Sequence, residues 1–329
     1  MNNAYDNLSI DILKQNMPAS LGQEAKTFLR KWQVLISAEG DGANDIALDV
    51  SELRCIFTVK YDMSGRAICS LQIYNLNPST EATILRKGYK VTILAGYQQS
   101  RYGVIFSGNI IQAFTNRNNG TDYISEIYAI NYEAIWQANT IRTNLAAGSE
   151  PRETLQAIAN NADKPLTFGK ITEGLNRQKM PRGEVLFGDV SAFIRDLTFF
   201  DDAFDIINAN GEIEITKFND EIPQGMAIDL SPNNGLIGAP IYSDDGIIIP
   251  MLLDSRIRIR SLIRIPNNII LRQQANFNFD NGISSQIDKF ESTGEYKIAS
   301  FTHEGDTYGD IWKTEVIGFS TKKDLMQIR

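Results

Sequence analysis

The sequence predicts a mainly β fold with an α+β insertion, in which two small antiparallel β-barrel domains are separated by an α+β module. Three observations lead to this prediction. Short runs of β-branched and aromatic residues, bounded by Gly, Asp, Asn or Ser, dominate residues 28–131 and 223–329. Helical periodicity is concentrated between these two blocks, in residues 149–222. Two hairpin segments, one in each outer block, also resemble each other.

These patterns divide the 329 residues into four parts. Residues 1–27 are polar and are predicted to form an N-terminal arm. Residues 28–148 comprise the first barrel and a helix that follows it, residues 149–222 the α+β module, and residues 223–329 the second barrel.

The first block alternates strands with turn residues. Asn119 and Gly120 form a strong hairpin signal, because both residue types tolerate positive φ. The segments with strand composition are residues 28–37, 53–62, 68–76, 90–97, 103–115 and 122–131.

Two helices are expected in this block. One begins with Asn77 as N-cap and Pro78 in the first helical position, and it ends at Gly88. The second covers residues 131–148 and ends at Gly148.

The module between the barrels has two helices and a hairpin. Residues 151–163 are predicted to be helical, and a hairpin over residues 204–218 turns around Asn210 and Gly211. The second helix carries one apolar stripe at steps of three and four, formed by Val190, Phe193, Ile194, Leu197 and Phe200.

The third block contains residues 252–265, LLDSRIRIRSLIRI, in which arginine and isoleucine alternate. Because consecutive side chains of a strand point to opposite faces, this segment is predicted to be one β-strand with an apolar face and a cationic face. The cationic face holds Arg256, Arg258, Arg260 and Arg264. Three roles for it stay open: contact with carboxylates of a neighbouring subunit, the lining of a lumen through which DNA passes, or a solvated outer face.

The preceding run, GLIGAPIYSDDGIIIP, is apolar but broken by Gly and Pro. Such a segment is either a buried strand pair or an assembly surface, and we expect it to pack partly on a neighbour. Its candidate interface residues are Ile247, Ile248 and Ile249.

The two similar hairpins lie about 187 residues apart. Each has a strand that ends in Phe-Thr, at Phe114 and Phe301, then a polar turn, then a strand with a central glutamate, Glu126 or Glu315. This pattern predicts a duplicated barrel, although convergence of two unrelated hairpins would produce it too.

Composition excludes several functions. The net charge is -8 and the pI about 4.9, which argues against non-specific binding to nucleic acid or to membrane surfaces. The N-terminus lacks a signal-peptide pattern, and no apolar run approaches the roughly 20 residues of a membrane span, so we expect neither export nor membrane insertion. Cys55 and Cys69 are expected to be buried free thiols, which fits folding in the cytoplasm.

No residues suggest catalysis. His303 lies near Glu304, Asp306 and Asp310, but we interpret this segment as a solvated turn rather than a metal site. Asp201, Asp202 and Asp205 are interpreted as a polar helix end. The chain has neither a GxSxG nor a Walker motif. We therefore predict no catalytic, cofactor-binding or metal-binding residues, no cofactor and no enzymatic activity.

Several segments together resemble the tail-hub (baseplate hub) proteins of tailed bacteriophages. They are NLNPSTEATIL, YKVTILAGY, DVSAFIRDLTFFDDAFDIINANGEIEIT and GLIGAPIYSDDGIIIPMLLDSRIRIRSLIRI. The resemblance covers about residues 91–265, while the N-terminal arm and the last fifty residues match in pattern only.

The resemblance implies a structural virion protein that forms a homotrimer with two tube-like barrels per subunit. Six barrels would then form a pseudo-sixfold ring between the tail tube protein and the central spike protein, with an axial channel for DNA in transit. It also implies contacts with other baseplate proteins, a place in the virion tail, and assembly in the host cytoplasm.

Two other classes of function are considered. A receptor- or carbohydrate-binding β-protein of the tail tip would stack the rings of Trp136, Trp312 or tyrosines in one groove. A cell-wall hydrolase would cleave peptidoglycan.

Overall fold

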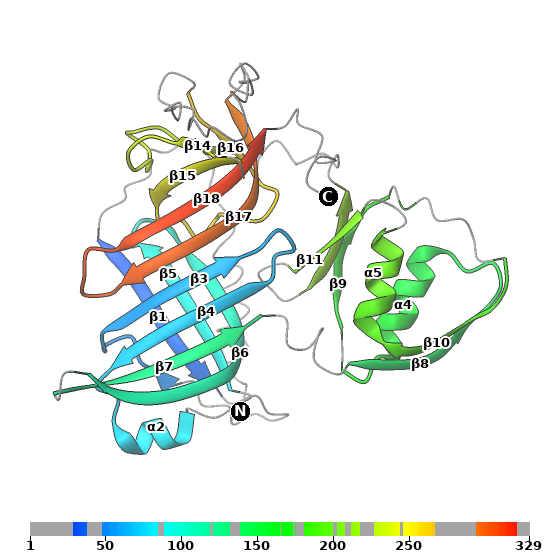
Figure 1. Ribbon diagram of the computed structural model, residues 1–329, viewed down its shortest axis with the longest axis horizontal. Helices are drawn as coiled ribbons and strands as arrows, with labels where there is room; N and C mark the ends of the chain where they lie inside the picture. The colour runs from blue at the N-terminus through cyan, green and yellow to red at the C-terminus, as the bar shows by residue number, and fades with distance from the viewer. Residues whose placement is uncertain are drawn as a thin grey trace, which may run out of the picture. The chain divides into compact units, whose positions relative to one another are not determined.

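The computed structural model describes residues 29–37, 48–84, 89–118, 121–131, 139–164, 166–173, 175, 181–199, 203–207, 212–217, 227–243, 246–266 and 294–320 (Figure 1). The chain divides into two compact units, which we name the central unit (residues 33–94 and 104–221) and the C-terminal unit (residues 1–32, 95–103 and 222–329). The predicted N-terminal arm lies outside the described residues, and the four-part division of the sequence remains a prediction.

The central unit contains a sheet whose strands follow the order β3-β4-β7-β6-β5-β1-β2. Side chains alternate between the core and the outer face, as in β4, where Cys69, Leu71 and Ile73 are buried. The predicted strands of the first block are confirmed. The strands are β1 (Arg30–Ser37), β2 (Leu48–Asp49), β3 (Cys55–Tyr61), β4 (Ala67–Tyr74), β5 (Lys90–Tyr97), β6 (Ser100–Asn118) and β7 (Asp122–Ile130).

Helix α2 (Pro78–Ile84) begins where the sequence predicts it. The main-chain N–H of Glu81 donates to the carbonyl of Asn77 at 2.8 Å, so Asn77 occupies the N-cap position. The predicted end of the helix at Gly88 and the predicted hairpin turn at Asn119 and Gly120 lie outside the described residues.

The helix predicted for residues 131–148 is wrong in the part that the structure describes. Residues 140–145 form strand β8 (Thr140–Leu145), which pairs antiparallel with β10 (Glu184–Asp189). Two β-branched residues, Thr140 and Ile141, open the segment. Ile141 and Leu145 are buried whereas Arg142 and Asn144 are exposed, and this alternation favours a strand over a helix. Residues 132–138 lie outside the described part of the chain.

The α+β module has two helices packed between two small sheets (Figure 1). One sheet is β8–β10, and the other has the order β11-β12-β9. Both predicted helices are confirmed, and Val190, Ile194 and Leu197 of the predicted stripe are buried. The remaining elements are α4 (Pro151–Asn161), α5 (Val190–Phe199), β9 (Phe168–Ile171), β11 (Ala203–Ile207) and β12 (Ile213–Lys217).

The turn between β3 and β4 holds this module inside the central unit. The N–H of Ile207 donates to the carbonyl of Ser64 at 3.0 Å, and the side chains of Arg66 and Asp205 lie 3.8 Å apart. Gly65 has φ +71, and a Cβ there would lie 2.4 Å from the carbonyl oxygen of Ile207. Only glycine therefore permits this close approach.

The C-terminal unit contains a sheet of the order β14-β15-β18-β17-β16, and β13 pairs in parallel with β16. The predicted C-terminal hairpin is confirmed as β17 and β18. The strands are β13 (Ile228–Asp229), β14 (Ile241–Ser243), β15 (Gly246–Leu252), β16 (Leu262–Arg264), β17 (Glu295–Asp306) and β18 (Trp312–Ser320).

Residues 252–265 do not form the single strand that their alternation predicts. Strand β15 ends at Leu252, turns occupy residues 255–256 and 259–260, and only Leu262–Arg264 returns to the sheet as β16. The physical reason is local: Asp254 accepts a bond from the main-chain N–H of Arg256, and Arg260 has φ +66, which no strand accommodates.

The two larger sheets are open, so the predicted barrels are corrected to open sheets. Among the described strands, β3 does not pair with β2, and β14 does not pair with β13. A barrel closes only when its end strands pair. Here β2 and β13 have two residues each and β14 has three, which leaves little backbone for closure.

The two units nevertheless repeat one arrangement of strands. The order β3-β4-β7-β6-β5 of the central unit corresponds to β14-β15-β18-β17-β16 of the C-terminal unit. In both units the first four strands of this series pair antiparallel with their neighbours. The duplication that the sequence predicts is therefore present as a common strand order.

A β-bulge marks the same place in both hairpins. The register of β6 with β7 shifts at Ile111, and the register of β17 with β18 shifts at Ala299. One residue before each bulge, the N–H of Ile110 or Ile298 donates to the residue that directly precedes β5 or β16, at 2.7 Å and 3.0 Å. The similarity thus extends to individual hydrogen bonds.

This register confirms one part of the sequence match and corrects the other. Phe114 and Thr302 each lie three residues after the bulge of their strand. Glu126 lies opposite Phe114 and Glu315 lies opposite Thr302, so the two glutamates are equivalent. Phe114 therefore corresponds to Thr302, one residue away from Phe301, with which the sequence aligns it.

Candidate functional site

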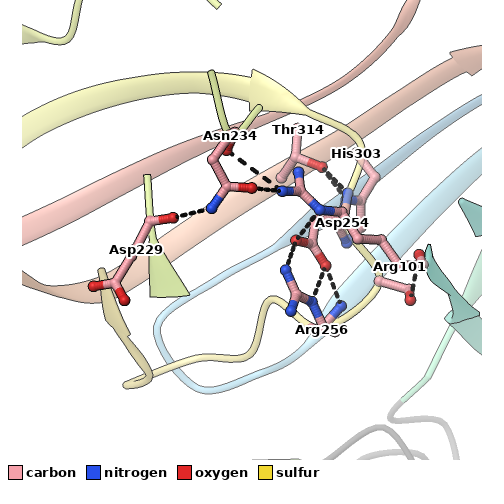
Figure 2. Close-up of polar contacts among 8 residues, drawn as sticks. Arg101, Asp229, Asn234, Asp254, Arg256, His303 and Thr314 are labelled. Carbon is pink, nitrogen blue, oxygen red and sulfur yellow. Dashed lines mark hydrogen bonds and ion pairs between the residues drawn. The ribbon is translucent and has the colours of Figure 1, made fainter. Parts of the chain in front are cut away.

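A buried group of charges lies where β15 ends in the C-terminal unit. Figure 2 shows the carboxylate of Asp254 between the guanidinium groups of Arg101 and Arg256. The side chain of Asp254 is fully buried, that of Arg101 is 1% exposed, and that of Arg256 is 34% exposed. Two cations thus share one anion, and the group carries one net positive charge.

Arg256 makes the tighter contact. Its Nε donates to Oδ1 of Asp254 at 2.9 Å and its Nη2 to Oδ2 at 2.7 Å, a bidentate geometry. These hydrogen bonds raise the pKa of Arg256.

Arg101 lies in the left-handed backbone region, with φ +56. Its Nη2 donates to Oδ1 of Asn234 at 2.5 Å, its Nε lies 3.4 Å from Oδ2 of Asp254, and its carbonyl accepts the hydroxyl of Ser255 at 2.8 Å. Burial lowers the pKa of Arg101, and the charge of Asp254 opposes this shift. The contacts join residues 95–103 to the loop that follows β15.

Gly235 permits this arrangement. Its φ is +86, and a Cβ at this position would lie 2.3 Å from Nη1 of Arg101. The backbone of the 231–236 turn therefore packs directly on the guanidinium, and the side chain of Asn234 anchors the turn by donating to the carbonyl of Asp229 at 2.7 Å (Figure 2).

His303 is buried in β17, so its expected place in a solvated turn is wrong. It is 1% exposed, and its Nδ1 lies 2.7 Å from Oγ1 of Thr314. Burial lowers its pKa to about 3, and the charge of Arg258 adds to this shift. The imidazole is therefore neutral at ordinary pH.

The carboxylates near His303 in sequence have other partners. Glu304 pairs with Lys313 at 3.1 Å, and Asp306 accepts the N–H of Tyr308 at 3.1 Å. Among the described residues, no group of three or more His, Cys, Asp or Glu side chains is placed to hold a metal ion.

The other predicted arginines also contact their own chain. Arg258 donates to the carbonyls of Ser255 and Ile257 at 2.6 and 2.8 Å. Arg264, 44% exposed, pairs with Glu295 at 2.9 Å and lies 3.9 Å from Asp229.

Arg260 and the isoleucines of β15 occupy three kinds of position. The N–H of Arg260 donates to the carbonyl of Ile298 at 2.8 Å, and its side chain is half-buried. Ile247 and Ile249 belong to the core, whereas Ile248 is half-buried on the opposite face. Contact of these residues with a partner remains a prediction.

A second candidate surface of the C-terminal unit is an open depression of about 370 Å³. Three of its lining residues, Leu29, Ile237 and Ile311, are 62%, 39% and 52% exposed. The lining also includes Trp312, which is 4% exposed and whose ring centre lies 5.5 Å from the guanidinium of Arg30. Apolar side chains exposed around a depression favour a protein contact.

The remaining predicted residues are cysteines, aspartates and tryptophans. Cys55 and Cys69 are buried free cysteines, as predicted, and burial raises the pKa of both thiols, that of Cys55 to about 12. Asp201, Asp202 and Trp136 lie outside the described residues. Asp205 does not lie at a helix end, as predicted, but in β11, where it pairs with Arg66. The rings of Trp32 and Trp312 pack in a T-shaped arrangement with centroids 6.1 Å apart, and Trp312 is only 4% exposed, so its ring is not open to a sugar.

Sequence reasoning missed Arg101, Asn234 and Asp254. Asp254 had a weak signal, since an aspartate side chain often accepts a hydrogen bond from the main-chain N–H two residues further on and so favours a local turn. Arg101 had none, because its partners lie in a distant part of the chain.

No protein-family model matches this chain, and no curated protein matches it. Its fold, however, is that of solved tail proteins. It is similar to a tail protein from Neisseria meningitidis MC58, with 7% identity, a TM-score of 0.55, and coverage of 88% of this chain and 96% of that one. It is also similar to the 43 kDa tail protein of prophage MuSo2 from Shewanella oneidensis, with 9% identity, a TM-score of 0.53, and coverage of 88% and 98%.

A third similar structure is a Francisella PdpA–VgrG complex in its half-lidded form, with 9% identity, a TM-score of 0.52, and coverage of 96% of this chain and 61% of that one. At these identities the likeness shows a shared fold. The first two structures are described as tail proteins. None of the described helices is both long and apolar enough to cross a membrane.

Proposed function

We propose that this chain is the hub of a phage-type tail, a structural protein without catalytic activity. Three copies form a ring with pseudo-sixfold symmetry that joins the tail tube to the central spike. The ring leaves an axial channel through which DNA passes. The protein is then a component of the virion tail that assembles in the host cytoplasm.

The duplicated sheet is the observation that carries this proposal. A threefold body can present six similar surfaces only if each chain carries the surface twice. Here five strands of each unit follow the same order, and both hairpins carry a bulge at the same place, Ile111 and Ala299. Likeness to two tail proteins, each covered almost completely, supports the same class of function.

The partners follow from the position of such a ring. One face binds the tail tube protein and the other binds the central spike protein, while the rim contacts other baseplate proteins. The likeness to a structure that contains VgrG is consistent with a spike-type partner. Permanent assemblies of this kind bury roughly 2,000 Å² or more per interface.

Side chains with an accessible cation or apolar group supply the contacts between copies. Arg256 and Arg264 keep 34% and 44% of their side chains exposed while they pair within the chain, so each guanidinium can also bind a carboxylate of a neighbour. Ile248 adds an apolar contact, whereas the buried Ile247 and Ile249 stabilise the sheet itself.

Light scattering on the purified chain tests the proposal. We expect a mass of three subunits, and electron-microscopy class averages with six lobes. A chain that stays monomeric at high concentration contradicts the ring, and so do trimers with only three lobes.

A further inference from the structure

The depression in the C-terminal unit is apolar and accessible. Leu29, Ile237 and Ile311 line it, and these side chains are 62%, 39% and 52% exposed. Its volume of about 370 Å³ is at the small end of binding pockets. Large apolar side chains that gather around a hollow, rather than lie scattered, mark a contact with another part of a protein.

The predicted N-terminal arm leads into the described chain at the rim of this depression. Leu29 is the first described residue, and its own side chain lines the depression. Its carbonyl accepts the N–H of Gln98 at 2.9 Å. Nη2 of the next residue, Arg30, donates to the carbonyl of Asp310 at 2.9 Å, directly before Ile311 in the chain. The point from which the arm starts is therefore fixed next to the residues that line the depression.

One segment of the arm has the composition of a buried surface. Residues 5–13, YDNLSIDIL, which we name the arm segment, lie outside the described residues and include five large apolar side chains. These are Tyr5, Leu8, Ile10, Ile12 and Leu13. The longer stretch from Lys14 to Lys26 includes only two, Met17 and Leu21. The arm segment is thus the part of the arm that gains most from leaving water.

The charges of the arm segment and the depression are complementary. The arm segment has two carboxylates, Asp6 and Asp11, and no cation. The lining of the depression includes two cations, Arg30 and Lys313, and one carboxylate, Asp310. Lys313 keeps 40% of its side chain exposed while it pairs within its own chain. Apolar contact and opposite charge therefore favour the same pairing of surfaces.

We propose that the arm segment covers the depression of its own chain. Fifteen residues lie between Leu13 and Leu29. An extended chain advances at most about 3.5 Å per residue, so this connection reaches roughly 50 Å, which is more than contact beside its own starting point requires. The covalent tether makes the contact intramolecular, so weak interactions suffice to populate it. A second copy or a different protein lacks this tether. The contact does not depend on the function proposed above.

Disulfide formation in the full chain tests this contact. The substitutions Ile10→Cys and Ile311→Cys place one thiol in the arm segment and one at the depression. Ile311 is 52% exposed, so the fold tolerates the change. The native Cys55 and Cys69 are buried and their pKa values are raised, so they do not compete for the oxidant. With oxidised glutathione we expect a disulfide within one chain, which mass spectrometry and a non-reducing gel identify.

The matched control replaces Ile10→Cys by Met17→Cys. Met17 is closer to Leu29 in sequence, so the tether alone predicts that the control pair forms its disulfide at least as fast. Contact of the arm segment predicts the opposite order, with the Ile10 pair about tenfold faster or more. Adding Ile12→Asp to the Ile10 pair should remove this advantage, because it places a charge in the apolar contact.

The proposal is overturned if the control pair is as fast as the Ile10 pair, if Ile12→Asp has no effect, or if no disulfide forms. A disulfide mainly between two chains, at a rate that rises with protein concentration, overturns it in favour of the arm of a second copy. Ile237→Cys in place of Ile311→Cys repeats each comparison at a second position of the depression.

Light scattering on the same samples separates this proposal from the ring. A monomer with the disulfide inside one chain counts against the ring only. A trimer in which the control pair is as fast as the Ile10 pair counts against the arm contact only.

Discussion

The carboxylate of Asp254 lies 3.4 Å from Nε of Arg101, and both side chains are removed from solvent. Neither residue lies near the other in sequence, so the pair forms only when the C-terminal unit folds. A buried charge without its partner is strongly unfavourable, which makes this pair a sensitive point of the fold.

Replacing Asp254 by asparagine should destabilise the protein by about 3–5 kcal/mol, because Arg101 keeps its charge and loses its counter-ion. Urea denaturation measures the free energy of unfolding. The matched control is Glu295→Gln, which breaks the exposed pair with Arg264 and should cost less than about 1 kcal/mol. Equal losses in the two variants would show that the buried pair has no special role.

Gly235→Ala should destabilise more than Gly238→Ala. Both glycines have positive φ, +86 and +70, so both substitutions incur the strain of an L-residue there, roughly 1–2 kcal/mol. Only at Gly235 would the new methyl group also collide with Arg101, whereas nothing lies within 4 Å at Gly238. Thermal unfolding of both variants checks this order, and a larger loss at Gly238 would refute it.

The single histidine makes the protein less stable in acid. The folded pKa of His303 is about 3 and the ordinary value is 6.5, so between these values the unfolded chain binds a proton that the folded chain does not. Stability from this group is thus complete above about pH 6.5 and is lost as the pH falls toward 3. The imidazole resonance in NMR spectra should not titrate between pH 8 and 5, and a midpoint near 6.5 in the folded protein would contradict burial.

Equivalent pairs of polar side chains should stabilise both sheets. Thr115 and His303 each lie four residues after the bulge of their strand, so they occupy equivalent positions. The hydroxyl of Thr115 lies 3.1 Å from that of Ser125, and Nδ1 of His303 lies 2.7 Å from the hydroxyl of Thr314. Ser125→Ala and Thr314→Val should each cost about 1–3 kcal/mol, since each leaves a polar partner without its hydrogen bond. Denaturation of the single and double variants should give additive losses, because the pairs share no contact.

Much of the fold could be predicted because local pattern and tertiary packing agree. The strands of β3, β4 and β7 alternate apolar and polar residues, and the start of α2 has an N-cap followed by proline. The stripe of α5 at helical spacing faces its core for the same reason.

Prediction failed where a tertiary contact overrides the pattern. The alternation of residues 252–265 indicates a strand, but the buried carboxylate of Asp254 turns the chain toward Arg256 and Arg101. Residues 140–145 carry good helix formers on either side, and pairing with β10 decides their conformation. Arg101 is distant in sequence from Asp254, and β10 is distant from residues 140–145, so no local pattern reports these contacts.

The register that relates the two sheets also shows where they differ. Two residues beyond the end of β15 stands Asp254, and two residues beyond the end of the matching strand β4 stands the buried Leu76. A ring of six identical chains inherits every mutation at six places. A chain that carries both sheets confines each mutation to one of them, so natural selection can fit one sheet to a new neighbour while the other keeps its ancestral surface.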